Sequence, residues 1–150
     1  MDTDRRRALG AGAAAAAALF LGGTGRAPAT VHELEAAIAK LGGTREPAAG
    51  RLTLSLPKVA ENGHSVPVSL SVESPMTERD HVVAAMILAP DNPNVEVATF
   101  RFTPKSGRAQ VTTRMRLATT QEVVAVARLA DGGVLRTSTP VRVVVGGCGA

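Results

Sequence analysis

The spacing of apolar residues changes once along the chain, near residue 50. In the stretch 30–43, "TVHELEAAIAKLGG", apolar side chains recur every three or four positions, which is the spacing of one face of an α-helix. These residues are Val31, Leu34, Ile38 and Leu41. Thr30 and Glu33 have the spacing of a capping box, and Gly42 is typical of a helix end. The pattern predicts a single helix at the start of the folded region.

From residue 51 onward, apolar and polar residues alternate with a period of two, as in β-strands with one buried face. The segments with this character are residues 51–56, 66–73, 81–89, 94–102, 109–117, 122–129 and 134–145. The segment 81–89, "HVVAAMILA", is almost entirely apolar and predicts a strand buried on both faces. The odd step between Val97 and Phe100 predicts a bulge or a change of face.

Turn-forming residues separate these segments. Asp131-Gly132 between two alternating strands indicates a hairpin, and Pro140 indicates an edge position or a break in its strand. About seven short strands, with turns every 8–12 residues, predict an all-β fold, an immunoglobulin-like antiparallel β-sandwich preceded by one N-terminal α-helix. The chain has one cysteine and no tryptophan, so it lacks the disulfide and core tryptophan of antibody domains.

Residues 1–29 have the pattern of an export signal. Three arginines, Arg5 to Arg7, precede an uncharged alanine-rich stretch, and a small-x-small sequence ends at Ala29. This order predicts a cleaved twin-arginine signal peptide and a periplasmic protein without membrane attachment after cleavage. The alternative is an N-terminal membrane anchor, but the stretch is only weakly hydrophobic, and spanning a bilayer takes about 20 strongly apolar residues.

The expected organisation therefore has three parts. Residues 1–29 form the signal peptide, residues 30–145 form the helix and the β-sandwich domain, and residues 146–150 form a flexible C-terminal arm.

Charge and aromatic content argue against nucleic-acid binding. Residues 1–29 hold four arginines and two aspartates, and so account for +2 of the net charge of +4. The rest of the chain has no tryptophan or tyrosine, and its aromatic residues are Phe100 and Phe102. Nucleic-acid surfaces usually combine dense basic patches with stacking aromatic side chains. We expect no nucleic-acid partner.

Residues that would support metal binding or catalysis are scattered. His32, His64 and His81 fall on a helix, a turn and a strand start, whereas metal sites need three or four converging ligands. The sequence contains no GxSxG, no phosphate-binding loop and no dinucleotide-binding motif in a strand–helix setting. We predict no catalytic residue, no metal site and no cofactor, and a periplasmic metal chaperone is disfavoured for the same reason.

Arginines recur on outward positions of the predicted strands, and two interpretations of them stay open. These residues are Arg101, Arg114, Arg116, Arg128, Arg136 and Arg142. They form either a solubilising face or a surface for an anionic ligand or partner.

The only cysteine, Cys148, lies in the C-terminal sequence "VRVVVGGCGA", beyond the last predicted strand. Gly146, Gly147 and Gly149 flank it, and glycine populates backbone conformations closed to other residues. A catalytic cysteine needs a nearby base or positive field, and residues 143–150 contain no cation. Cys148 is therefore predicted to bind a substrate covalently and present it to other proteins. The alternative is an interaction domain that uses Cys148 for an intermolecular disulfide.

The twin-arginine signal, the helix, the β-sandwich and the terminal "VVVGGCGA" together resemble the SoxY family, the sulfur-compound carrier subunits of the Sox thiosulfate-oxidising system. The stretches "ENGHSVPVSLSVESPMT" and "NPNVEVATFRFTPKSGRAQVTTRMRLATTQEVVAVA" are also similar to that family. One departure is Ala150, where the usual pattern ends in a second glycine.

The resemblance implies a role and partners. Cys148 would be the substrate-binding residue, with Gly146, Gly147 and Gly149 as the glycines of the arm. The family implies a heterodimer with a SoxZ-like β-sandwich subunit. It also implies transient contacts with a haem c enzyme that joins thiosulfate to the thiol, a manganese-dependent hydrolase that releases sulfate, and a sulfane dehydrogenase. None of these activities belongs to this chain, which would be a carrier and not an enzyme.

Overall fold

The computed structural model describes residues 31–42 and 48–147. The predicted signal peptide 1–29, the capping residue Thr30, and Cys148 and Gly149 of the predicted arm lie outside these residues.

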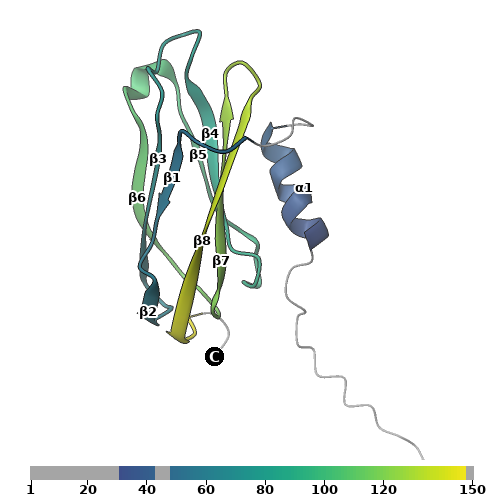
Figure 1. The fold of residues 1–150 in the computed structure, drawn as a ribbon, viewed down its shortest axis with the longest axis vertical. Coiled ribbons are helices and arrows are strands. Elements are labelled where there is room, and N and C mark those ends of the chain that lie inside the picture. The colour runs from purple at the N-terminus through teal and green to yellow at the C-terminus, as the bar shows by residue number, and fades with distance from the viewer. Residues whose placement is uncertain (1–30, 43–47, 148–150) are drawn as a thin grey trace, which may run out of the picture.

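One helix and two β-sheets make up the described part of the chain (Figure 1). The elements are α1 (Val31–Gly42), β1 (Leu52–Ser55), β2 (Val59–Asn62), β3 (Val66–Val72), β4 (Val82–Leu88), β5 (Glu96–Arg101), η1 (Pro104–Ser106), β6 (Ala109–Met115), β7 (Gln121–Leu129) and β8 (Val134–Val145). One sheet has the strand order β1-β3-β6, and the other has the order β2-β8-β7-β4-β5. The predicted all-β sandwich with one N-terminal helix is confirmed.

Strand β2 is the main departure from the predicted topology. The sequence "VAEN" contains a single buried residue, Ala60, so it shows no alternation of apolar and polar residues. It pairs in parallel with the end of β8, with Ala60 opposite Val143 and Asn62 opposite Val145. The sandwich is therefore not wholly antiparallel, because β2 lies parallel to the end of the last strand, β8.

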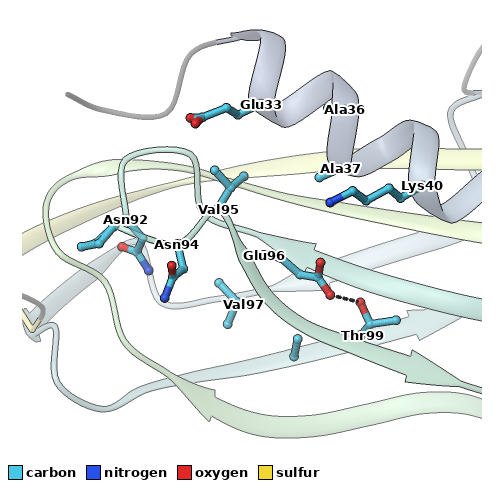
Figure 2. A pocket seen from close by; sticks show the side chains of 12 residues that line it. Glu33, Ala36, Ala37, Lys40, Asn92, Asn94, Val95, Glu96, Val97 and Thr99 are labelled. Carbon is cyan, nitrogen blue, oxygen red and sulfur yellow. Dashed lines mark hydrogen bonds between the residues drawn. The ribbon is translucent and has the colours of Figure 1, made fainter. Parts of the chain in front are cut away.

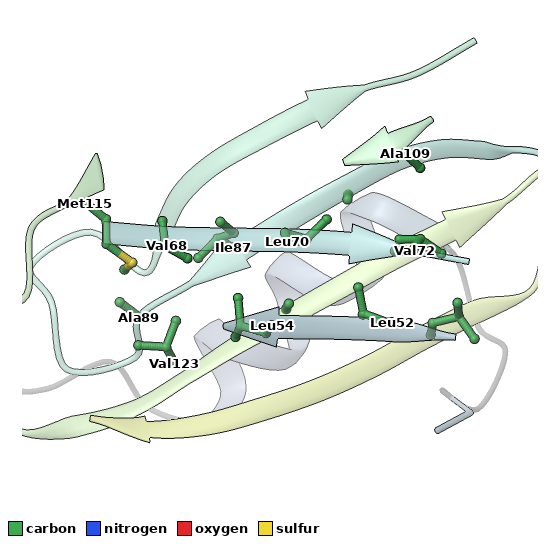
Figure 3. Packing of buried hydrophobic residues seen from close by; sticks show 14 of the residues in the cluster. Leu52, Leu54, Val68, Leu70, Val72, Ile87, Ala89, Ala109, Met115 and Val123 are labelled. Carbon is green, nitrogen blue, oxygen red and sulfur yellow. The ribbon is translucent and has the colours of Figure 1, made fainter. Parts of the chain in front are cut away.

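The main core lies between the two sheets (Figure 3). Alternate residues of β1 and β3 point into it, among them Leu54, Val68 and Leu70. From the larger sheet, Ile87 and Val123 meet them. The period of two therefore identified the buried faces of β1 and β3 correctly.

A second apolar cluster lies on the other face of the larger sheet, under α1 (Figure 1). The helix buries Leu34, Ala37, Ile38 and Leu41. They pack against β4, β7 and β8, for example against Met86 and Val126. The segment 81–89 is buried on both faces because α1 covers one face and the sandwich core the other. The sequence pattern assigned Val31 to the buried face of the helix, and this was wrong, since Val31 is 76% exposed in the structure. In the described residues, no helix is both long and apolar enough to cross a membrane.

Local irregularities match the sequence pattern. Ile87 of β4 pairs with Ala98, whereas Leu88 pairs with Glu96, so Val97 is the extra residue of a bulge. Pro140 pairs with Glu122 of β7, while β2 joins the other side of β8 only from Arg142 onward. Pro140 therefore sits where β8 lacks a partner strand on one side, a position that tolerates a residue without an amide hydrogen.

Truncating a buried side chain should lower the free energy of unfolding more in the main core than in the cluster under α1. Ile87→Ala removes a 1% exposed side chain between the sheets and should lower the free energy of unfolding by about 3–4 kcal/mol, as large core truncations do. Leu34→Ala, in a helix packed on one side only, should cost about 2 kcal/mol. Urea unfolding followed by circular dichroism measures both, and an equal or larger loss for Leu34→Ala would contradict this ranking.

Candidate functional site

Backbone hydrogen bonds hold the chain against the sandwich just after the end of β8. The amide of Gly147 donates to the carbonyl of Leu117, with an N–O distance of 2.8 Å, and the amide of Leu117 donates to the carbonyl of Gly63, also at 2.8 Å. The amide of Gly63 donates to the carbonyl of Val145 at 2.7 Å. We call Gly63, Leu117, Ala118, Gly146 and Gly147 the arm root. Three distant segments are joined there by main-chain hydrogen bonds.

Close approach of backbones makes glycine necessary in the arm root. A Cβ atom on Gly63 would collide with the carbonyl oxygen of Leu117 and lie 2.8 Å from the amide nitrogen of Gly147. A Cβ atom on Gly146 would collide with the carbonyl of Ala118, and one on Gly147 with the carbonyl of Gly63. Because these neighbours are backbone atoms, no side chain can rotate away to make room.

This geometry changes the interpretation of two arm glycines. The sequence assigned Gly146, Gly147 and Gly149 to a flexible arm that begins after Val145. In the structure, Gly147 is buried and Gly146 is partly buried, and both pack on the sandwich. Their glycine identity therefore has a steric cause. Cys148 follows directly after the hydrogen-bonded Gly147; Cys148 and Gly149 lie outside the described residues, so their part in the arm stays a prediction.

Cationic residues from other segments lie beside the arm root. Arg114 at the end of β6, Arg116 just beyond it and Gly147 line one groove of about 530 Å³, and Asn94 and Glu96 also belong to its lining. His64 adjoins the root as well, since its backbone nitrogen is among the atoms that a Cβ on Gly147 would strike. Local sequence around Cys148 could not reveal these residues, which are distant in the sequence and are brought there by the sheet topology.

A buried amide pair holds the wall of this groove in place. The Asn92 side chain donates to the carbonyl of Arg116 at 2.8 Å and accepts from the amide of Ala118 at 2.8 Å. Gln121 donates from Nε2 to the Asn92 side-chain oxygen at 3.0 Å and accepts from the amide of Asp91 at 3.0 Å. Satisfied buried polar networks rigidify their surroundings. The loop before β5 is thus fastened to the segment that supports the arm root.

A larger open cleft of about 820 Å³ lies between α1 and the loop that leads into β5 (Figure 2). Figure 2 shows Glu33 and Lys40 on the helix side, and Asn94 and Glu96 on the strand side. The side chain of Glu96 accepts a hydrogen bond from Thr99 at 2.7 Å. The mixed charges give this cleft no distinct ligand preference.

Histidines and acidic residues do not converge on a metal site in the part of the chain that the structure describes. His32 lies in α1, His64 in the turn after β2, and His81 just before β4. The His81 ring lies 2.9 Å from the carbonyl oxygen of Thr77, a contact within its own loop.

The arginines that the sequence grouped together have different surroundings. Arg136 forms an ion pair with Glu35 of α1, with an N–O distance of 3.1 Å, and Arg128 packs beside Gly42 under the helix. Both belong to the seam between α1 and the sheet. Arg114 donates to the hydroxyl and the carbonyl of Ser65. Only Arg114 and Arg116 of the six line the groove at the arm root.

Because the glycines of the arm root are packed against backbone atoms, adding one methyl group at Gly63 should destabilise the protein. Gly63→Ala should lower the free energy of unfolding by about 2–3 kcal/mol, since overpacking against fixed backbone costs this much, and should speed hydrogen exchange of the Gly147 and Leu117 amides. Gly133→Ala is the control, because its nearest atom is the Asp131 side chain, 2.9 Å away, which can rotate. Unchanged exchange at Gly147 in Gly63→Ala would show that the root is not clamped in this way.

Comparisons with known proteins add to this geometry. A family model described as "Sulfur oxidation protein SoxY" matches residues 38–148. The solved structure of the sulfur carrier protein SoxY from Chlorobium limicola f thiosulfatophilum is 29% identical. The alignment covers 76% of this chain and 98% of that chain, with a TM-score of 0.64. No curated protein sequence matches the chain.

Other solved structures share the fold alone. The superoxide reductase (neelaredoxin) from Ignicoccus hospitalis is 15% identical, with 63% of this chain and 80% of that chain covered and a TM-score of 0.56. The superoxide reductase from Nanoarchaeum equitans is 11% identical, with 67% and 99% covered and a TM-score of 0.52. The family model, by contrast, spans the last part of the helix, both sheets and the position of the lone cysteine. The chain belongs to the SoxY family of sulfur oxidation proteins, which are sulfur carriers and not enzymes.

Proposed function

We propose that this chain is the covalent carrier of sulfur intermediates in periplasmic thiosulfate oxidation, with the substrate attached to the thiol of Cys148. The observation that supports this most is the position of the lone cysteine, directly after Gly147, which the sandwich holds by its backbone. The family match extends to residue 148. The twin-arginine pattern in residues 1–29 supports export to the periplasm.

The proposed loading step forms an S–S bond between the Cys148 sulfur and the outer sulfur of thiosulfate. The product is an S-thiosulfonate, the thiol proton passes to solvent, and two electrons pass to a haem c partner enzyme. A manganese-dependent hydrolase then adds water to the sulfonate sulfur, so that sulfate leaves and a persulfide stays on Cys148. A sulfane dehydrogenase oxidises the outer sulfur of this persulfide and accepts its electrons. This chain supplies the thiol and its presentation, and the partners supply oxidation and hydrolysis.

A SoxZ-like β-sandwich subunit is the proposed permanent partner. The apolar segment 81–89 offers no free face for this contact, because the sandwich core covers one of its faces and α1 covers the other. Exposed apolar residues lie elsewhere, on the outer face of β2 and the end of β8, where Val59 is 47% exposed and Val144 is 59% exposed. The parallel register places Val59 opposite Arg142, two residues before Val144, so both valines point outward from the same face. This patch supports a partner contact close to the arm root.

Loading of Cys148 is the first test. After incubation with thiosulfate and the haem c partner, intact-protein mass spectrometry should show an adduct that a reductant removes and that peptide mapping places on Cys148. Cys148→Ser, which keeps the size of the side chain, should show no adduct and no turnover in the reconstituted pathway. Full pathway activity in Cys148→Ser would refute the carrier role.

Non-reducing electrophoresis in parallel with the activity assay tests the alternative use of Cys148. If the chain worked through an intermolecular disulfide, the covalent dimer would be the active species. A carrier is blocked by the same bond, because its thiol is then occupied. We expect the dimer to be inactive until it is reduced.

The partner patch predicts a charge-sensitive contact. Val144→Asp should weaken binding of the SoxZ-like subunit at least tenfold, since a buried unpaired carboxylate is costly at an interface. Val31→Asp on α1, at a position that is 76% exposed, should leave binding unchanged. Isothermal titration calorimetry with the two purified subunits measures both, and equal affinities would place the contact elsewhere.

A further inference from the structure

We infer that the groove beside the arm root is a binding site for the anionic end of the sulfur substrate while it is attached to Cys148. We call it the arginine groove; it is the groove of about 530 Å³ whose lining includes Arg114, Arg116, Asn94, Glu96 and Gly147. The ligand class is a tethered sulfonate or sulfate-like oxyanion. The inference rests on the proposed covalent role of Cys148 and adds a recognition site on the sandwich itself.

The arginine groove lies next to the point where the substrate would be attached. Gly147 is part of the groove lining. A trans peptide places the Cα of the next residue only about 3.8 Å from its own Cα. Arg116 directly precedes Leu117, whose carbonyl accepts the Gly147 amide at 2.8 Å. Cys148, which would carry the substrate, follows Gly147 in the sequence, and Arg116 precedes Leu117. The hydrogen bond between Gly147 and Leu117 therefore brings the backbone next to the substrate close to the backbone of Arg116.

Both arginines of the groove have guanidinium nitrogens that no described residue occupies. Among residues 31–42 and 48–147, the Arg116 guanidinium makes no hydrogen bond or ion pair. Arg114 contacts Ser65 through Nη1, so its Nε and Nη2 stay available to a ligand. Arginine presents its donors in a planar fork that matches the oxygens of an oxyanion.

The groove lining carries a net positive charge, and hydrogen bonds hold its wall in place. Glu96 is the acidic residue in the groove, and it accepts a hydrogen bond from Thr99, so the two arginines leave a net positive lining. Asn92, 8% exposed, ties the backbone of Arg116 and Ala118 to the opposite loop. The groove is thus formed before the ligand arrives, which lowers the entropic cost of binding.

The test uses two thiol reagents and no partner enzyme, so that its failure and that of the proposed function are distinguishable. In each, the Cys148 thiolate attacks a methanethiosulfonate, a disulfide forms and methanesulfinate leaves. One reagent transfers a negatively charged sulfonatoethyl group, and the other a positively charged trimethylammonioethyl group. The ratio of the two second-order rate constants reports the local field, because the thiolate fraction affects both rates equally.

At low ionic strength, Arg116→Gln should slow the anionic reagent and speed the cationic one by about twofold each, as expected for one charge at about 10 Å in water. The anionic-to-cationic rate ratio should therefore fall about fourfold. Glu96→Gln should raise the ratio by a similar factor. Arg101→Gln, at the opposite end of β5, is the charge-matched control and should leave the ratio unchanged. The differences should shrink at high salt. The inference fails if Arg116→Gln behaves like Arg101→Gln.

A structural readout completes the test. In the protein that carries the sulfonatoethyl group, the amide resonances of Arg114 to Ala118 and of Asn94 to Val97 should shift. A third reagent, methyl methanethiosulfonate, puts a neutral methyl disulfide on Cys148 and should leave these resonances in place. A charge-dependent rate ratio without these shifts would mean that the arginines only attract the reagent, and would overturn the binding site. If the rate ratio and the resonance shifts support the arginine groove but the haem c partner loads no thiosulfate on Cys148, the proposed function is wrong and the binding site stands.

Discussion

The backbone of Leu117 is the contact on which the presentation of the C-terminal thiol depends. Its amide donates to Gly63 and its carbonyl accepts from Gly147, so one residue joins the turn after β2 to the end of the chain. The side chain of Leu117 is fully buried in the main core. The position of the arm root is therefore coupled to the packing of the sandwich, because moving Leu117 would open the core.

Several features of the fold follow from the need to bring these segments together. Strand β2 runs parallel to the end of β8, and this places Gly63 at the level of Val145 and Gly147. The turn there is closed by the side chain of Asn62, which accepts from the amide of His64 at 2.9 Å. Only glycine fits where three backbones meet, so the residues that look like hinges in the sequence are contact points in the structure.

Sequence reasoning identified the elements whose signals are local. Alternation in segments such as 66–73 indicated the buried faces of the strands, the apolar run 81–89 indicated a strand covered on both faces, and Pro140 indicated a position without a neighbour on one side. Strand β2 was missed because it has one buried side chain and is held by backbone pairing. The arm root and the arginine groove were missed because their members lie far apart in the sequence, and no spacing rule links Gly63 to Arg116. The sequence showed the glycines of the arm and left two interpretations of the arginines open, but only the topology shows which of these residues lie together.

The position of the arm root also limits how partner enzymes can approach. If the arm began at Val145, Cys148 would lie three residues, or about 10 Å, from the sandwich. Because the amide of Gly147 is hydrogen-bonded to the sandwich, only one peptide unit separates a held residue from Cys148, and a trans peptide spaces consecutive Cα atoms about 3.8 Å apart. An enzyme that takes the thiol into its active site must then contact the sandwich surface around the arm root. In the proposed pathway, the partner enzymes would all meet the same few groups, among them Arg116. The surface next to the thiol would therefore be a common recognition surface, and substitutions there would affect several steps of sulfur transfer at once.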